Sequence, residues 1–416
     1  MKIGYSNKLN KIILIGVLIA ALVVTSGCTD KSASNKSSEV SAPAEASGAV
    51  DADKAAEASG AVDADKAAES SGKFTLTDGF GREVTIPENV ERVVCSGAGC
   101  LRYLVYLQAQ DYLVGVDSIE KEKSEIEGRP YALANPQLKD YPLFGEFRGK
   151  DDPEKIITIS PQVILKTGAN SQPTTTNTAD ADSLQNKTGI PVVMLPYGSL
   201  KNEEQKAEMY SSLRIMGEAV GKQERAEEVI SYIEATMQDL ENRTADIPES
   251  ERKTVYVGGV SSAGAHGIIS TEPAYPPFLW VNAKNVAAGM GADHADIAKE
   301  ALVDWDPEYV FIDIGTLQLG KEGAIGELKN DTSLTGLSAV KNKKVYGVIP
   351  YNYYSTNYES VLANAYFVGK VLYPDRFEDI DPEAKANEIY TFFLGKPLYS
   401  DLNGQYDNLG FKPIPL

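Results

Sequence analysis

The feature that most constrains the fold is a set of short apolar segments that alternates with helical stretches and occurs in two series. The first series contains "LVGVD" from residue 113, "PQVILKTG" from 161 and "IPVVMLPYG" from 190. The second contains "TVYVGGV" from 254, "PEYVFIDIG" from 307 and "KKVYGVIPY" from 343. Short apolar strands that alternate with helices are typical of parallel sheets with helical crossovers. The sequence therefore predicts two α/β lobes.

A long helical span separates the two series. Neither Gly nor Pro occurs between Lys222 and Asp246, apolar residues recur there at helical spacing, and Pro248 ends the pattern. A helix of this size reaches about 36 Å, which is enough to connect two domains. The predicted fold class is α/β, with two Rossmann-like lobes on central, mainly parallel sheets, joined by one long spanning helix.

The N-terminus has the order of an export signal. Lysines at positions 2, 8 and 11 precede an apolar run from Ile12 to Val24, which is too short to span a bilayer but suits a secretory signal. Cys28 follows small residues in a context that resembles a lipoprotein signal, although Thr25 stands where Leu or Val is usual. We expect residues 1–27 to be a lipoprotein-type signal peptide. The lipid on Cys28 would anchor the exported protein to the outer face of the cytoplasmic membrane; the alternative is ordinary secretion.

Residues 29–72 differ in composition from the remainder of the chain. They contain no aromatic residue, and "ASGAVDADKAAE" occurs twice in succession, from Ala46 and from Ala58. Such a segment cannot bury enough apolar surface to offset the entropy of ordering. We therefore expect a flexible tether over residues 28–72. The predicted folded part comprises an N-terminal lobe (73–200), a helical connector with the spanning helix (201–250) and a C-terminal lobe (251–416).

Charge and cysteine content argue against a nucleic-acid-binding protein and against a disulfide-rich fold. The chain has 59 acidic and 40 basic residues and a formal net charge of -19, which argues against nucleic acid as a partner because phosphate binding relies on clustered Lys and Arg. Only Cys95 and Cys100 remain beyond the anchor cysteine, so no disulfide framework is expected. We interpret both as core residues in preference to metal ligands.

Two local sequences have the same spacing. "PEKIITISPQVIL" and "KEALVDWDPEYVFI" place Glu154 and Glu300 each seven residues before a proline that precedes an apolar strand. Acidic residues also open helices for electrostatic reasons alone. Together with "TDGFGREVTIPENVERVV" and "NVAAG", these pieces make residues 74–375 resemble class III periplasmic-type substrate-binding proteins of ABC importers, the receptors for ferric siderophores, haem and vitamin B12. "EGRPYALANPQLKDYPLFG" resembles the iron or metal-chelate branch of that family.

The resemblance implies a function. The protein would be a monomeric extracytoplasmic receptor, not an enzyme, that captures a metal chelate, such as a ferric siderophore or related iron complex, between its lobes. It would deliver this ligand to a membrane permease and its ATPase, and would hold no cofactor of its own. The resemblance also implies that Glu154 and Glu300 dock into the permease. Alternative ligands are haem, a corrinoid or a molybdate-type oxyanion.

Other classes of protein have weaker support. A surface-anchored hydrolase is disfavoured because "GVSSAGAHG" does not fit the G-x-S-x-G pattern of a nucleophile elbow. An adhesion or cell-wall module would suit the tether equally well. "VVCSGAGCLRYL" has two glycines of a dinucleotide fingerprint, but Arg102 stands where the third is needed. We therefore interpret Gly97 and Gly99 as a tight turn facing the cleft.

Ligand contacts are expected from loops at the carboxyl ends of strands. Arginine forks recognise carboxylates and phosphates, although either arginine could instead pair with surface acids, and Tyr and Trp suit a planar or partly apolar chelate. A bare divalent ion fits poorly because the chain has only His266 and His294. The candidate ligand-binding residues are Ser96, Gly97, Arg129, Arg148, His266, Tyr275, Trp280, Tyr351 and Tyr354.

The anchor assignment gives the first prediction. Replacement of the lipid-accepting thiol in Cys28→Ser removes the site of attachment, so the protein should move from the membrane fraction into the medium. Immunoblots of both fractions measure this change. Retention of the variant in the membrane pellet would show that Cys28 is not the anchor.

Overall fold

The computed structural model describes residues 72–122, 126–168 and 177–416. Of the two units into which the chain divides, residues 1–64 lie wholly outside the described residues, and residues 65–416 contain all of them. The predicted signal peptide, the expected lipidation site Cys28 and the predicted tether up to residue 71 are likewise outside them. No helix in the described ranges is both long and apolar enough to cross a membrane.

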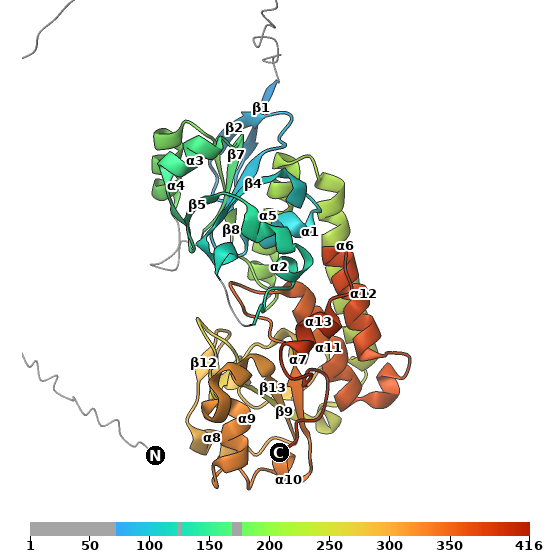
Figure 1. Ribbon diagram of the computed structural model, residues 1–416. Coiled ribbons are helices and arrows are strands. Elements are labelled where there is room, and N and C mark those ends of the chain that lie inside the picture. The colour runs from blue at the N-terminus through green and yellow to red at the C-terminus, as the bar shows by residue number, and fades with distance from the viewer. Residues whose placement is uncertain (1–71, 123–125, 169–176) are drawn as a thin grey trace, which may run out of the picture. The chain divides into compact units, whose positions relative to one another are not determined.

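The N-terminal lobe is built on a six-stranded sheet in the order β6-β5-β4-β3-β7-β8 (Figure 1). Adjacent strands are parallel except for β6, which runs antiparallel to β5. A separate antiparallel hairpin of β1 (Lys73–Thr77) and β2 (Glu83–Pro87) precedes the sheet. The strands of the sheet are β3 (Val93–Ser96), β4 (Leu113–Asp117), β5 (Leu143–Glu146), β6 (Lys150–Asp151), β7 (Val163–Gly168) and β8 (Val192–Pro196). The helices of this lobe are α1 (Cys100–Tyr106), α2 (Pro130–Ala134), α3 (Pro153–Ile159), α4 (Thr178–Thr188) and α5 (Glu203–Ala219).

The central strands of this sheet are buried on both faces, as expected for parallel strands covered by helices. Successive side chains of a strand point to opposite faces. Val163 and Leu165 of β7 accordingly join the larger core, whereas Ile164 packs in a second cluster with Ile156 of α3 and Leu184 of α4. The continuous apolar runs in the sequence therefore correspond to strands with two helical layers.

The C-terminal lobe has a smaller, all-parallel sheet in the order β11-β9-β13-β14. β10 and β12 form a separate two-stranded antiparallel sheet in this lobe. The strands are β9 (Thr254–Gly258), β10 (Ser270–Thr271), β11 (Lys284–Asn285), β12 (Ala295–Asp296), β13 (Tyr309–Asp313) and β14 (Val345–Val348). The helices are α7 (Pro276–Trp280), α8 (Lys299–Trp305), α9 (Ala324–Asn330), α10 (Ser338–Lys341), α11 (Tyr358–Leu372), α12 (Pro382–Leu394) and α13 (Tyr399–Gly404).

Short 3₁₀ turns connect many of these elements. They are η1 (Gln110–Tyr112), η2 (Ser118–Lys121), η3 (Pro136–Asp140), η4 (Glu249–Glu251), η5 (Ala288–Met290), η6 (Ile314–Glu322) and η7 (Pro374–Phe377). Two of them, η2 and η6, directly follow β4 and β13 at the carboxyl ends of those strands.

Helix α6 (Gln223–Thr244) spans the two lobes (Figure 1). Its 22 residues correspond to a length of about 33 Å. Near its first end, Arg225 Nε donates to the carbonyl of Tyr106 in the N-terminal lobe at 3.1 Å. Near its last end, Arg243 pairs with Asp379 at 2.6 Å. The predicted fold class, two α/β lobes with mainly parallel sheets and one spanning helix, is confirmed.

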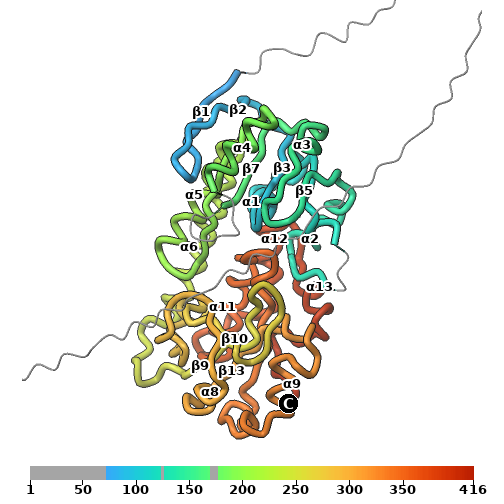
Figure 2. Tube along the Cα trace, turned by 90° about the vertical axis from the view of Figure 1, so that its left-hand side faces the viewer, coloured from blue at the N-terminus to red at the C-terminus, as the bar shows by residue number. Residues whose placement is uncertain are grey.

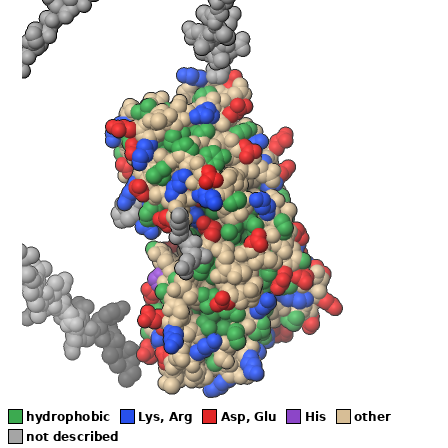
Figure 3. All heavy atoms as spheres, in the orientation of Figure 1, with side chains coloured by type: hydrophobic (Ala, Val, Ile, Leu, Met, Phe, Trp, Pro, Cys, Tyr) green, Lys and Arg blue, Asp and Glu red, His purple; other side chains and the backbone are tan. Residues whose placement is uncertain are grey.

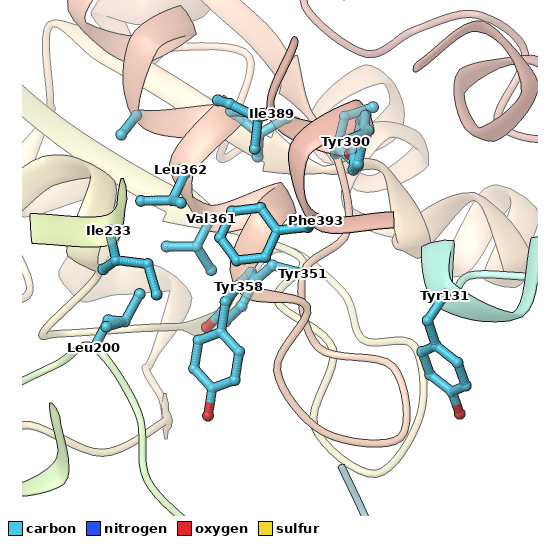
Figure 4. Close-up of a cluster of buried hydrophobic side chains, with 14 of the residues drawn as sticks. Tyr131, Leu200, Ile233, Tyr351, Tyr358, Val361, Leu362, Ile389, Tyr390 and Phe393 are labelled. Carbon is cyan, nitrogen blue, oxygen red and sulfur yellow. The ribbon is translucent and has the colours of Figure 1, made fainter. Parts of the chain in front are cut away.

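Helices α11 and α12 connect the lobes a second time (Figure 2). Figure 4 shows side chains of α6 (Ile233), α11 (Val361, Leu362) and α12 (Ile389, Phe393) gathered in one buried cluster. Helix α12 also packs against α1 and α2 of the N-terminal lobe. The segment after residue 251, expected from the sequence to form the C-terminal lobe, thus supplies helices that contact both lobes.

Candidate functional site

A cavity of about 380 Å³ lies between the two lobes. Every loop or turn that lines it comes after the carboxyl end of a parallel-sheet strand: β3, β4 and β5 on one side, and β9, β13 and β14 on the other. This is the position at which open α/β sheets bind ligands. The lining residues are Ala98, Ile119, Phe147, Arg148, Ser261, Ala263, Gly264, Ala265, Gln318, Asn352, Tyr353, Tyr354 and Ser355.

One wall of the cavity is formed by residues 352–355, which belong to the segment 352–357 that leads from β14 toward α11 and is here called the clamp loop. Arg102 of α1 is fully buried and holds this loop from the N-terminal lobe. Its Nη2 donates to the carbonyls of Tyr353 (3.1 Å) and Tyr354 (3.2 Å), and its Nε donates to Asn357 Oδ1 at 3.1 Å. Arg102, which stands where a dinucleotide fingerprint would have its third glycine, therefore connects the two lobes by hydrogen bonds.

Two more groups of the N-terminal lobe hold the clamp loop. The hydroxyl of Tyr197, which follows β8, accepts a hydrogen bond from the Thr356 backbone N–H at 2.8 Å. The carbonyl of Gly128 accepts one from Asn357 Nδ2 at 3.0 Å. The cavity wall contributed by the C-terminal lobe is thus fixed to the opposite lobe by several hydrogen bonds.

Tyr354 connects three elements at the edge of the cavity. Its hydroxyl donates to Asp117 Oδ2 at 2.8 Å and accepts a hydrogen bond from the Arg148 backbone N–H at 3.0 Å. Burial raises the pKa of Asp117 to about 7, an effect that the hydrogen bond from Tyr354 opposes. Tyr354 therefore bridges the ends of β4 and β5 across the space between the lobes.

Among the described residues that line the cavity, Arg148 is the one that carries a positive charge. It is exposed, lines the cavity, and has no ion pair within the described residues. Its guanidinium carbon lies 5.2 Å from the centre of the Phe147 ring. No Asp or Glu occurs among the residues that line the cavity. In a protein of net charge -19 the residues that line the cavity thus carry one arginine and no carboxylate, whereas Figure 3 shows acidic and basic side chains intermingled on the outer face.

Strained backbone gathers at this cavity. Arg148, Ala263, Tyr354 and Ser355 have φ of 61°, 56°, 47° and 82°, in the left-handed region that residues with a Cβ seldom adopt. Such conformations persist where the surrounding structure enforces them, and they cluster at binding sites. The hydrogen bonds to the clamp loop supply that enforcement for Tyr354 and Ser355.

The small-residue loop after β9 forms the opposite wall. His266 closes it, because its Nε2–H donates to the carbonyl of Ser262 at 2.7 Å. The His266 carbonyl in turn accepts a hydrogen bond from Thr316 Oγ1 at 2.6 Å. His266 therefore shapes the loop that lines the cavity, and its ring lies 5.8 Å from that of His294.

A buried carboxyl lies behind this wall. Asp313, at the end of β13, accepts a hydrogen bond from the Gly315 N–H at 2.9 Å, and burial raises its pKa to about 7. Its Oδ2 has no hydrogen-bond partner within the described part of the chain.

The structure brings two of the predicted ligand residues, Arg148 and Tyr354, into the cavity wall. Gly97 directly precedes the lining residue Ala98; its φ is 87°, and a Cβ there would lie 2.6 Å from Thr167 Oγ1. This is consistent with the expected tight turn. Ser96 lies beneath the turn, where its hydroxyl donates to Asp151 Oδ1 at 2.7 Å and accepts from Lys166 Nζ.

The other predicted ligand residues lie elsewhere. Arg129 is buried and pairs with Glu120 at 3.0 Å and with Glu127 at 2.6 Å, so the salt-bridge alternative describes it. Tyr275 is fully buried in the C-terminal core, 4.8 Å from the Phe278 ring. The expectation that these two side chains face the cleft is contradicted by their burial.

Tyr351 and Trp280 also depart from the expectation. Tyr351 is buried and donates to Glu272 Oε2 at 2.8 Å. The other carboxylate oxygen of Glu272, Oε1, lies 2.9 Å from Lys201 Nζ. Trp280 is nine-tenths buried at the end of α7 and lines a different hollow, between α6 and α7. Neither side chain lines the inter-lobe cavity.

Several lining residues escaped the sequence analysis. Asn352 and Ser355 lie in "PYNYYSTNY" (residues 350–358), the segment that contains the candidate residues Tyr351 and Tyr354, and Asn352 Nδ2 donates to the Ser261 carbonyl at 2.7 Å. Their position in the segment that follows the carboxyl end of β14 was the available signal. Ile119 and Gln318 also line the cavity, and they lie in the 3₁₀ turns η2 and η6, which no sequence pattern predicted.

The described residues contain neither a cluster of metal-ligating side chains nor a disulfide. Within the ranges described, no three His, Cys, Asp or Glu side chains come together as a metal-binding group. Cys95 and Cys100 are buried free thiols, and Cys100 Sγ donates to the Leu165 carbonyl at 3.3 Å. This placement agrees with their interpretation as core residues.

Comparison with known proteins identifies the class that this fold and inter-lobe cavity define. A model of the periplasmic binding protein family matches residues 93–351, and the chain belongs to this family. The family-level resemblance is thereby confirmed. Its members are substrate-binding receptors rather than enzymes, and they are extracytoplasmic partners of ABC-transporter permeases.

Individual relatives are distant. The chain is similar to the molybdate-binding protein MolA of Haemophilus influenzae, with 24% identity over 341 residues that cover 76% of this chain and 90% of MolA. It is 20% identical to the uncharacterized ABC transporter substrate-binding lipoprotein YvrC of Bacillus subtilis, over 73% of this chain and 87% of YvrC.

Solved structures share the fold. The structure of MolA bound to molybdate gives a TM-score of 0.60 at 21% identity and covers 78% of this chain and 98% of that one. A periplasmic solute binding protein from Veillonella parvula gives a TM-score of 0.61 at 18% identity, covering 80% of this chain and 97% of that one.

The hydrogen bonds of the buried Arg102 give the second prediction. In Arg102→Met the bonds to the clamp loop are lost and the buried Glu359 loses its nearest opposing charge, so the free energy of unfolding should fall by about 3 kcal/mol. Urea unfolding followed by circular dichroism measures this loss. The matched variant Arg148→Met changes an exposed arginine without an ion pair and should cost less than about 0.5 kcal/mol. Equal losses in the two variants would show that Arg102 does not hold the loop.

Proposed function

We propose that this protein is the lipid-anchored receptor of an ABC importer for a compact anion, which it binds at Arg148 in the inter-lobe cavity. The observation that carries the proposal is the unpaired guanidinium on a cavity wall without carboxylates. An arginine on a cavity wall binds oxyanions and carboxylates through charge-assisted hydrogen bonds. The protein would act by binding alone, without catalysis.

The size of the cavity narrows the ligand class. About 380 Å³ lies at the lower end of the range for small-molecule pockets, roughly 300–1,000 Å³. A compact oxyanion fits this volume more readily than haem or a corrinoid. We therefore place a molybdate-type oxyanion first, and the similarity to the molybdate-binding protein MolA supports this choice.

An anionic iron chelate is the second candidate. Phe147, Tyr353 and Tyr354 give the cavity an aromatic side, and aromatic rings suit the apolar part of a chelating ligand. This retains the metal-chelate receptor expected from the sequence. The loop arginine that would neutralise the chelate is the same Arg148, so both candidates depend on one residue.

Calorimetric titration tests the site. Removal of the cation in Arg148→Ala should weaken binding of the preferred anion roughly ten- to a hundredfold, the effect of losing about 1.5–3 kcal/mol from a charged hydrogen bond. Arg214→Ala, which removes an exposed arginine of α5, should bind like the wild type.

The choice of titrant separates the two candidates. Molybdate and sulfate represent oxyanions, and ferric citrate represents an iron chelate. Binding of ferric citrate without binding of molybdate would favour the second candidate. Unchanged affinity of Arg148→Ala for the titrant that binds would refute the assignment of this cavity.

Docking of the receptor is proposed for Glu154 and Glu300. Both are exposed residues of short helices, neither lines the cavity, and neither has an ion-pair partner in the described residues. Unpaired carboxylates on each lobe suit contacts with cations of a membrane permease.

The double variant Glu154→Ala/Glu300→Ala therefore separates docking from binding. Uptake in a strain that lacks the wild-type receptor should be abolished because the contacts to the permease are gone. Affinity for the bound anion should stay within twofold, since the cavity is unchanged. Normal uptake would refute the docking role, and weakened affinity would move these residues into the binding site.

A further inference from the structure

Helices α3 and α8 are structural equivalents in the two lobes. Each has seven residues, and Glu154 and Glu300 are the second residue of their helix. Each helix ends at a residue in the left-handed region, Ser160 with φ of 52° and Asp306 with φ of 38°. A buried proline and a buried strand, β7 or β13, follow in both cases. In Figure 1, α3 lies at the upper left and α8 at the lower left.

The two helices also expose an apolar residue at the same place. Ile157 is 50% exposed and Val303 is 38% exposed, and each follows the helix glutamate by three residues. Residues three apart on a helix are neighbours on one face. An aliphatic side chain therefore lies one turn from each exposed carboxylate, while the preceding residue of each helix, Ile156 or Leu302, is buried.

The lysine on each of these helices is already paired. Lys155 lies 3.3 Å from Asp152, and Lys299 lies 2.9 Å from Glu327 and 3.0 Å from Asp331. These lysines do not neutralise the glutamates. Each helix thus presents an aliphatic group beside a carboxylate without a partner in the described residues.

A surface of this kind fits an interface. Binding energy at interfaces concentrates in a few apolar anchors surrounded by polar and charged contacts. Six large hydrophobic residues are exposed in the described ranges, and two of them occupy equivalent positions of a duplicated helix. Two copies of one surface call for a partner that presents its complementary site twice.

We propose that Ile157 and Val303 are the apolar anchors of this docking surface, and that the occupant is the permease, which offers on each half an apolar pocket beside a cation. The inference rests on the proposed function, because it assumes the permease as partner. It adds two residues that bind the permease by burial, independently of the salt bridges of Glu154 and Glu300.

Photo-crosslinking in cells tests this surface without knowledge of the transported ligand. A photoreactive side chain is placed at Thr158 or Asp304, exposed residues next to the anchors, in the full-length protein. The crosslinked product is identified by mass spectrometry as the permease. The variants Ile157→Ser and Val303→Ser should each lower the yield of this product roughly five- to tenfold. The conservative variants Ile157→Leu and Val303→Ile should keep it.

Controls separate the surface from the fold and from the glutamates. Met290→Ser, which changes another exposed apolar residue, should leave the yield unchanged, and all variants should keep the wild-type melting temperature. Full crosslinking by the serine variants, together with loss in Glu154→Ala/Glu300→Ala, would overturn the anchors and leave the docking role intact. Full crosslinking by the glutamate double variant and the serine variants alike, or no permease in the product, would overturn both.

Discussion

The structure depends on the burial of α11 between the two lobes. Every residue from Tyr358 to Gly369 is buried, and side chains of the first turn of the helix form hydrogen bonds with the N-terminal lobe. The Tyr358 hydroxyl donates to the Gly198 carbonyl at 2.7 Å, and Glu359 accepts a hydrogen bond from the hydroxyl of Tyr106. A carboxylate buried in this way is costly unless it is paired, and the nearby Arg102 cation offsets part of that cost. The same arginine holds the clamp loop, so the joint between the lobes and the cavity wall share one polar network.

This network limits how the lobes can move. Helix α6 spans both lobes, and α11 and α12 add apolar contacts between them. Opening the cavity by separating the lobes would break the hydrogen bonds from Arg102 to the clamp loop and expose the buried apolar contacts of α11. We infer that ligand enters a largely pre-formed cavity with local adjustment of Arg148 and Tyr354. Preorganisation of this kind lowers the entropic cost of binding.

The sequence predicted what depends on periodicity and spacing, and failed where the environment of a single side chain decides. Alternating apolar strands and an unbroken helical span predicted both sheets and α6. Within "PYNYYSTNY" (residues 350–358), however, Tyr351 is a core residue that donates to Glu272, whereas Tyr354 lines the cavity and donates to Asp117. Arg129 and Arg148 looked equivalent, and only the fold brings Glu120 to the first and leaves the second unpaired. Arg102 was seen only as an obstacle to a nucleotide site because its acceptors lie about 250 residues away in the sequence.

The duplicated helices and the cavity occupy opposite ends of the same strands. Helix α3 leads through Ser160 into β7, whose far end contacts the Gly97 turn through Thr167. Helix α8 leads through Asp306 into β13, whose far end carries Asp313 behind the cavity. A strand of five or six residues separates the two ends by about 17–20 Å. The proposed docking surface is therefore too distant to touch the ligand, yet one buried strand in each lobe joins it rigidly to the cavity wall. This arrangement lets a receptor change its ligand contacts in the loops without altering the helices that face its transporter.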